Sequence, residues 1–235
     1  MHAAVSLLPA LVVAAALLAG CDRVAALASG TALASFETRC ASLPPGRIDV
    51  VYVPKPVSED YSLGNADLER LAEPTAAHHR TVGLTRAQFG YRSTLELDGL
   101  EDPRGRRSCA RPRVRVEIAS SQMTVFVARE YRGDPCREPL ILGHEHRHVA
   151  VFEGYGKEIA PTLARDLDEF VGAGVRYAPT MADMRDSLRA ELSEHLDGFM
   201  ARARDELAAR HAAVDTEREY EMLARTCGAT ADLVR

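Results

Sequence analysis

The sequence predicts an α+β domain, in which a small antiparallel sheet is followed by a helical half. Two observations lead to this prediction. Before position 136, apolar residues recur at every second position in several short runs, as in strands with one buried face. After position 136, they recur at helical spacing. Strands that precede helices along a chain are typical of the α+β class.

The first half contains few well-marked elements. Ile48 to Val53 is a β-branched run that ends at a proline, which predicts a strand. Residues 65–73 predict a short helix that ends before Pro74, with Asn65 as its cap. Residues 74–112 have weak periodicity, and we expect a loop with one strand around 91–97 and a turn at 102–105.

The clearest alternation in the first half spans two neighbouring segments. Residues 114–118 and 123–127 both alternate between apolar and polar side chains, and Ser120-Ser121-Gln122 separates them. We predict that they form the two arms of a β-hairpin. This hairpin would complete the antiparallel sheet.

The second half is predicted to be helical. The first helix begins near Pro139, which suits a first helical turn, and extends to Gly154. Further helices are expected at 161–171 and 181–211, and residues 215–225 form a last helix or a continuation.

The first twenty residues have the features of a secretory signal. They contain no Asp, Glu, Lys or Arg, and their apolar run is too short to span a bilayer comfortably. The run ends in Leu18-Ala19-Gly20-Cys21, which resembles the lipobox of bacterial lipoproteins and implies that Cys21 carries a lipid. The alternative is a plain secretory signal or an uncleaved anchor.

These features predict the domain organisation and the location. We expect a signal peptide at 1–20, a tether at 21–38 and one folded domain at 39–235. The lipid would anchor the protein on the periplasmic side of the cell envelope, and the choice between inner and outer membrane stays open.

Four further cysteines remain for a compartment in which disulfides persist. Cys109 and Cys136 would meet at the open end of the predicted hairpin, so we expect them to pair. Cys40 would then pair with Cys227. The alternative is that some of the four are free buried thiols.

The charge pattern excludes one class of partner. The net charge is −5, and acids and bases are interspersed along the chain. A protein that binds nucleic acid usually carries a basic stripe, so we expect no nucleic-acid partner.

The segment from His144 to His148 carries the chemistry. In a helix the two histidines differ by about 40° in direction and about 6 Å in height, so both rings can reach one metal ion. Glu145 borders the same face without competing as a ligand. Zinc favours imidazole ligands and activates a water molecule, and an adjoining carboxylate can act as its base. We therefore predict that His144 and His148 bind Zn²⁺ and that Glu145 is catalytic.

A catalytic zinc usually has a third protein ligand. The metzincin continuation of the motif is absent, because Val151 and Gly154 occupy its required positions. We expect Glu219 as the third ligand. The alternatives are these carboxylates: Asp168, Glu169, Asp215 and Glu217. Asp215 could instead hold a ligating imidazole through its second nitrogen.

Residues 40–230 resemble a family of uncharacterised bacterial envelope proteins grouped among zinc peptidases. The likeness rests on a Gly-Leu-Thr segment at 83–85, a hairpin, a Cys shortly before His-Glu-x-x-His, and a late Asp-Thr element near a C-terminal Cys. Only the histidine motif is sharp. The resemblance implies a zincin-like fold and a gluzincin-type site, with a Glu from a later helix and an oxyanion steadied by Tyr220 or His211.

These features together predict an envelope lipoprotein that hydrolyses peptide bonds with a zinc-activated water. Its substrate would be a peptide or protein of the envelope. The alternatives are a non-catalytic zinc-binding or assembly lipoprotein, and a scaffold without metal. The remaining histidines are expected at the surface or outside the ligand set: His78, His79, His146 and His195.

Overall fold

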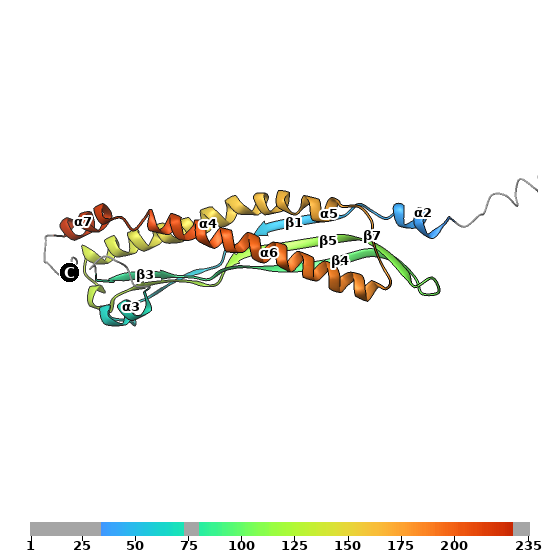
Figure 1. Cartoon of the computed structure of the whole chain (residues 1–235). Helices are drawn as coiled ribbons and strands as arrows, with labels where there is room; N and C mark the ends of the chain where they lie inside the picture. Colours follow the sequence, from blue (N-terminus) through green and yellow to red (C-terminus); the bar gives the residue numbers. More distant parts are fainter. Residues whose placement is uncertain (1–33, 73–79, 228–235) are drawn as a thin grey trace, which may run out of the picture. The chain divides into compact units, whose positions relative to one another are not determined.

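The computed structural model describes residues 34–72 and 80–227 (Figure 1). The chain divides into two compact units, residues 1–42 and 43–235. The described part of the first unit contains helix α2 (Phe36–Ala41), which is capped by Ser35: its Oγ accepts a hydrogen bond from the Thr38 N–H at 3.2 Å. The predicted signal peptide and Cys21 lie outside the described residues.

The second unit is α+β, as the sequence predicts. In chain order its elements are β1 (Arg47–Tyr52), β2 (Val57–Asp60), α3 (Asn65–Leu71), β3 (Gly83–Arg86), β4 (Phe89–Asp102), β5 (Arg107–Ser120), β6 (Met123–Val127), the 3₁₀ turn η1 (Arg129–Tyr131), α4 (Arg137–Asp166), α5 (Asp168–Gly172), β7 (Arg176–Ala178), α6 (Met181–Ala212) and α7 (Glu217–Thr226).

The strands form two sheets with matching order, β1-β5-β4 and β2-β6-β3, and β7 pairs with the start of β5. Along the chain β1 leads into β2, β3 into β4, and β5 into β6. The pairs β1–β5 and β2–β6 are parallel, whereas β4–β5 and β3–β6 are antiparallel. The two sheets therefore form one long three-stranded ribbon, and each of its three strands is interrupted at the boundary between the sheets. The sheet is mixed, and the prediction of an antiparallel sheet is wrong.

The predicted hairpin is also wrong. Residues 114–118 belong to β5 and residues 123–127 form β6, and these segments succeed each other within the central strand of the ribbon. The real hairpin joins β4 to β5 through the turn predicted at 102–105. The strand expected at 91–97 is the middle of the longer β4.

The alternation that suggested a hairpin has another physical cause. In β5 the buried residues occupy even positions from Val114 to Ser120, and in β6 they occupy odd positions from Met123 to Val127. In an unbroken strand this one-residue change of phase would bury the opposite face. Met123 and Val125 nevertheless share the main core with Val116 and Ile118, so the break between β5 and β6 takes up one residue and the same face stays buried.

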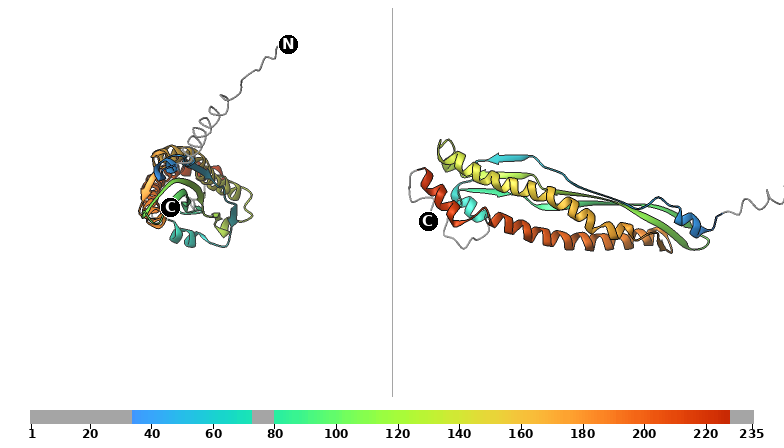
Figure 2. Two further views of the ribbon diagram at one scale, coloured as in Figure 1. Left: turned by 90° about the vertical axis from the view of Figure 1, so that its right-hand side faces the viewer. Right: turned by 90° about the horizontal axis from the view of Figure 1, so that it is seen from above.

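Helices α4 and α6 lie side by side along one face of the ribbon (Figures 1 and 2). Their apolar residues share the main hydrophobic core with β5. Because α6 returns antiparallel to α4, the beginning of α4 lies beside the end of α6, and α7 follows there. Within the described residues, no helix is both long enough and apolar enough to cross a membrane.

Two helix predictions need correction. The helices expected at 139–154 and 161–171 are largely one helix, because α4 continues through Pro161 to Asp166 and the short α5 follows. Pro161 removes one backbone donor, but Ile159 and Leu163 on either side of it are buried in the core, which keeps the segment helical.

Helix α3 is not capped by Asn65. Its cap is Gly64, whose N–H donates to Oδ2 of Asp67 at 3.0 Å. Asn65 is the first residue of the helix, so the reciprocal side-chain bond comes from the third helical position instead.

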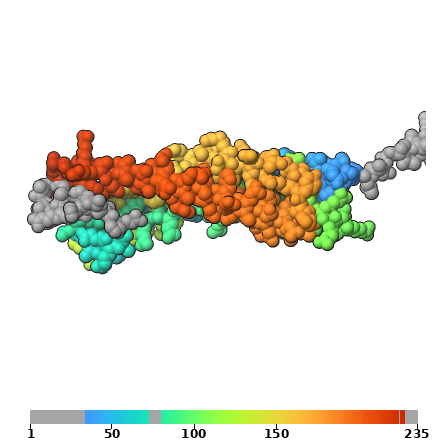
Figure 3. Space-filling view, viewed as in Figure 1, coloured from blue at the N-terminus to red at the C-terminus, as the bar shows by residue number. Residues whose placement is uncertain are grey.

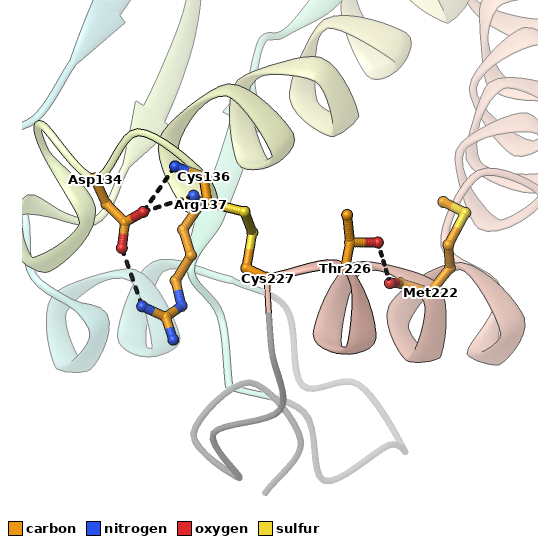
Figure 4. Close-up of a disulfide and its surroundings, with 6 residues drawn as sticks. All are labelled: Asp134, Cys136, Arg137, Met222, Thr226 and Cys227. Atoms are coloured by element: carbon orange, nitrogen blue, oxygen red, sulfur yellow. Dashed lines mark hydrogen bonds and ion pairs between the residues drawn. A yellow bond between two sulfur atoms is a disulfide. The ribbon is translucent and has the colours of Figure 1, made fainter.

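The predicted disulfide pairing is wrong. Cys136 bonds to Cys227 across the beginning of α4 and the end of α7 (Figure 4), and Cys40 and Cys109 are also disulfide-bonded. Without the predicted hairpin, Cys109 has no reason to approach Cys136. It lies near the start of β5, and the run from there to the end of β6 extends about 60 Å at about 3.3 Å per residue.

Candidate metal centre

The two histidines of the motif lie side by side in the early turns of α4. His144 and His148 are 7% and 8% exposed, and their Nε2 atoms are 3.3 Å apart. They are one helical turn apart and so project from the same face. The helix start is secured by Asp134, whose Oδ1 accepts hydrogen bonds from the N–H groups of Cys136 and Arg137 at 2.9 and 2.8 Å (Figure 4).

A third side chain, Asp215, approaches the pair from the turn between α6 and α7. Its Oδ1 is 3.1 Å from Nε2 of His144 and 3.1 Å from Nε2 of His148. Ligand atoms of a tetrahedral zinc with bonds of about 2.0–2.2 Å lie about 3.3–3.6 Å apart. The edges of the triangle, 3.1, 3.1 and 3.3 Å, come within a few tenths of an ångström of these values. In the described part of the chain, no other three His, Cys, Asp or Glu side chains form a group that could hold a metal.

The electrostatics of this triangle favour an ionised Asp215. Partial burial by itself would raise the pKa of Asp215, but hydrogen bonds with His144 and His148 outweigh it and hold the pKa far below its usual range. Burial by itself would lower the pKa of His144, but Asp215 and Glu145 outweigh it and raise the pKa. The carboxylate is thus available as a ligand at neutral pH.

Glu145 is a buried carboxylate beside the triangle. It is 5% exposed, and burial raises its pKa. Its Oε2 accepts a hydrogen bond from the Thr85 hydroxyl at 2.8 Å. Strand β3 passes so close that a Cβ on Gly83 would lie 2.6 Å from Oε1 of Glu145. Among the described residues no cationic side chain forms an ion pair with Glu145, and a buried carboxylate with a raised pKa is typical of a functional site.

Glu219, the ligand expected from the sequence, lies on the other side of His144. Its Oε1 forms an ion pair with Arg147 and is 3.8 Å from Nδ1 of His144, the ring nitrogen that faces away from Asp215. The Arg147 guanidinium is itself 2.9 Å from the same Nδ1. The structure differs here from the sequence prediction, because the turn before α7 brings Asp215, and not Glu219, to the two Nε2 atoms.

Tyr220 contacts the triangle through its hydroxyl group. The hydroxyl donates to Oδ1 of Asp215 at 2.9 Å, and its ring centroid is 5.8 Å from that of His144. Burial and the charge of Asp215 raise the pKa of Tyr220, so the hydroxyl stays protonated and remains a donor. In this position Tyr220 orients the carboxylate of Asp215.

His211, near the end of α6, contacts the ring of His148 at the nitrogen that does not face Asp215. The Nδ1 atoms of the two rings are 2.9 Å apart, and the His211 ring packs on Phe152 with centroids 4.4 Å apart. Burial and the neighbouring His148 lower the pKa of His211 to about 4, so the ring is neutral at pH 7. Its Nε2 is buried and has no hydrogen-bond partner within residues 34–72 and 80–227. His211 thus contacts Nδ1 of His148, whereas Nε2 of His148 faces Asp215.

The other candidate carboxylates lie elsewhere. Asp168 and Glu169 begin α5, and twenty helical residues at about 1.5 Å each place them about 30 Å along the helix from His148. Glu217 is exposed in the first turn of α7.

The remaining histidines are not part of the triangle. His146 is exposed, with its Nε2 3.4 Å from Glu59, as expected for a residue on the opposite side of α4. His195 contacts Asp166 at 2.9 Å. His78 and His79 lie outside the described residues.

Sequence reasoning missed the roles of Thr85 and Arg147. Thr85 holds the carboxylate of Glu145, and the only sequence signal was its place in the Gly-Leu-Thr segment. Arg147 lies within the motif itself and contacts both His144 and Glu219. The contact of Arg147 with His144 is an ordinary pair three residues apart on one helix. No spacing rule identifies the contacts of Thr85 with Glu145 and of Arg147 with Glu219, because each joins elements that are far apart in the sequence.

No protein family model, curated protein or solved structure matches the chain. The interpretation of the site therefore rests on its own geometry and chemistry.

Proposed function

We propose that this protein is a zinc-dependent hydrolase with a zincin-like site, and that it cleaves peptide bonds. One observation carries the proposal: Nε2 of His144, Nε2 of His148 and Oδ1 of Asp215 form a triangle with edges of 3.1–3.3 Å beside the buried carboxylate of Glu145. This ligand set replaces the gluzincin-type set with Glu219.

The donor set fits zinc. Two imidazole nitrogens and one carboxylate oxygen are ligands that Zn²⁺ favours, and three protein ligands leave a fourth position open. When bound in such a site, zinc polarises a carbonyl group and lowers the pKa of a water molecule towards neutrality.

Glu145 is the proposed general base. It adjoins the first ligand in sequence, and its raised pKa suits a group that takes a proton from water and returns it to a leaving amine. Thr85 holds one carboxylate oxygen, which orients the group.

An extended peptide is the proposed substrate. In the described chain, β3 is an edge strand of its sheet and runs past Glu145 at Gly83. A peptide that pairs with an exposed strand edge gains main-chain hydrogen bonds, so the scissile bond would lie beside the base.

Glu219 and Tyr220 serve as supporting groups in this proposal. When His144 ligates through Nε2, its proton resides on Nδ1. The Arg147 guanidinium, a donor that lies 2.9 Å from Nδ1, would then have to move aside, and Glu219, the nearest carboxylate at 3.8 Å, would accept the Nδ1 proton. Tyr220 donates its hydroxyl hydrogen to Asp215 and so orients this ligand.

The proposed location follows from the signal-like first twenty residues and Cys21. The enzyme would be lipid-anchored on the periplasmic side of the envelope and would act on peptides or proteins there.

The experiment measures zinc content and peptide cleavage of the purified full-length protein. We expect one zinc ion per chain, lost in the His144→Ala, His148→Ala and Asp215→Ala variants. His146→Ala is the matched control, because it removes an exposed histidine from the same helix and should keep the zinc. A wild-type protein that stays empty in zinc-supplemented buffer would exclude the proposed site.

Cleavage of a peptide library then separates an enzyme from a zinc-binding module. Chelator-sensitive cleavage by wild-type protein supports the hydrolase. Zinc binding without cleavage of any peptide would instead support the non-catalytic lipoprotein.

A further inference from the structure

The ligand Asp215 belongs to a segment that lacks a hydrophobic anchor. We call residues 213–227 the C-terminal arm; it comprises the turn after α6, α7 and Cys227. None of its described side chains is buried, and none belongs to either hydrophobic core cluster. Met222 on α7 is 51% exposed, and in Figure 4 it lies at a distance from the disulfide. Apolar burial therefore contributes little to holding the arm.

The arm is held by polar contacts with the first turns of α4. Asp215 contacts the two ligand histidines, and Glu219 contacts Arg147. The Tyr220 ring lies beside the ring of His144. Each of these contacts joins the arm to residues that form or flank the proposed metal site.

The two ends of the arm are constrained differently. Its first residues continue from α6, with backbone bonds from Val214 and Asp215 to the carbonyl of His211. Its last residue is linked covalently to Cys136, immediately before α4 (Figure 4). Figure 3 shows that α6 and α7 lie at the molecular surface. The disulfide is the strongest link between the far end of the arm and the helix that carries His144 and His148.

We propose that the Cys136–Cys227 disulfide is a positioning element of the metal site: it holds the C-terminal arm so that Asp215 completes the ligand set. This inference rests on the proposed function. With the disulfide formed, the arm is already confined near α4 when the ion binds. Without it, ion binding must order the arm, and that loss of conformational freedom weakens the affinity.

The coupling operates in both directions. If the disulfide strengthens metal binding, the metal must by the same free energy favour the docked arm. In a chain without the disulfide, zinc should therefore restore docking of the arm.

The experiment compares zinc affinity in three full-length proteins by competition with a chromophoric chelator. Cys136→Ser with Cys227→Ser removes the disulfide without leaving thiols that could bind zinc. Cys40→Ser with Cys109→Ser is the matched control, because these disulfide-bonded residues are not in the site. We expect the first variant to bind zinc about tenfold or more weakly, and the control to bind as the wild type does. Equal affinity of all three proteins overturns the inference.

Trypsin cleavage after the exposed Arg218 on α7 provides a second readout, which is independent of activity. In the Cys136→Ser, Cys227→Ser variant, we expect fast cleavage without zinc and slow cleavage with saturating zinc. Cleavage at the wild-type rate without zinc would show that the arm stays docked by itself and would contradict the inference.

Two further results separate failure of the inference from failure of the proposed function. If the wild-type protein binds no zinc, the proposed function fails. If Asp215→Ala loses zinc but the disulfide variant does not, only the inference fails. Should the disulfide variant not fold, hydrogen exchange of wild-type α7 amides decides the matter: slower exchange with zinc supports the coupling, and unchanged exchange overturns it.

Discussion

The two halves of helix α4 differ in whether they bury ionisable side chains against the ribbon. The first half buries His144, Glu145 and His148 beside the apolar Ile141 and Val149. The second half buries Ile159 and Leu163, together with other apolar residues of the main core. Both halves belong to one uninterrupted helix.

This difference distinguishes the residues that stabilise the fold from those that form the proposed site. Apolar burial in the second half stabilises the packing of α4 on the strands. Buried ionisable groups in the first half oppose stability unless they have partners, so their presence calls for a functional reason. We therefore expect substitutions in the first half to affect chemistry and those in the second half to affect folding.

The largest effect is expected for Glu145→Gln. Loss of the proposed base should lower kcat/KM for a cleaved peptide by about 10²- to 10⁴-fold, while zinc content stays unchanged. The measurement is the rate of peptide cleavage at equal zinc occupancy. Glu153→Gln is the control, since Glu153 lies on the same helix and faces Lys157 at 3.8 Å. Full activity of Glu145→Gln would contradict the assignment of the base.

The next largest effect concerns the second half of the helix. Leu163 is fully buried, so Leu163→Ala should lower the free energy of unfolding by about 2–5 kcal/mol through lost burial and a cavity. Denaturant unfolding of the zinc-free protein measures this change, and zinc affinity should remain that of the wild type. Leu71→Ala, at an exposed position, serves as the control with an effect below about 0.5 kcal/mol. A loss of zinc affinity in Leu163→Ala would mean that the two halves are not separable.

His211 tests whether support from α6 matters to the first half. When His148 ligates through Nε2, its Nδ1–H donates to Nδ1 of His211, which His211→Phe removes. Zinc affinity should fall by about 10- to 100-fold. His211→Asn, which restores a polar group near that position, should recover part of the loss, and His195→Phe should have no effect. An unchanged affinity in His211→Phe would leave His211 as a packing residue.

Two glycines of α4 are expected to have smaller effects on stability than Leu163. A Cβ on Gly156 would lie 2.2 Å from the ring of Tyr52 on β1, whereas one on Gly154 would meet nothing within 4 Å. Gly156→Ala should therefore destabilise the protein by about 1–3 kcal/mol through overpacking. Gly154→Ala should stabilise it by about 0.5–1 kcal/mol, because alanine favours the helix. Thermal unfolding of both variants checks the signs, and effects of the same sign would contradict the packing of β1 on α4.

Local patterns predicted most of the elements. The strand at 48–53 and the helix at 181–211 were expected within a residue or two of their bounds. Alternation in β5 and β6 correctly identified strands but not their partners, because alternation reports which face is buried and carries no information on pairing. The disulfide prediction failed with the hairpin on which it depended.

In the candidate site, too, local sequence patterns predict some contacts and only long-range packing establishes the others. His144 and His148 are one helical turn apart, and this spacing alone predicts that both rings can meet one ion and that Glu145 adjoins them. Whether Asp215 or Glu219 would complete the set depends on how the turn after α6 returns to α4, a contact between residues about seventy positions apart.

The sequence thus determined the α+β class, the helix that carries the histidines and the identity of two ligand candidates, because these depend on periods of two and 3.6 residues within single segments. The mixed order of the strands, the Cys136–Cys227 bond and the approach of Asp215 depend on long-range packing. Each of these is a long-range choice among several partners of similar local chemistry, and only packing of the whole core on the ribbon selects one of them.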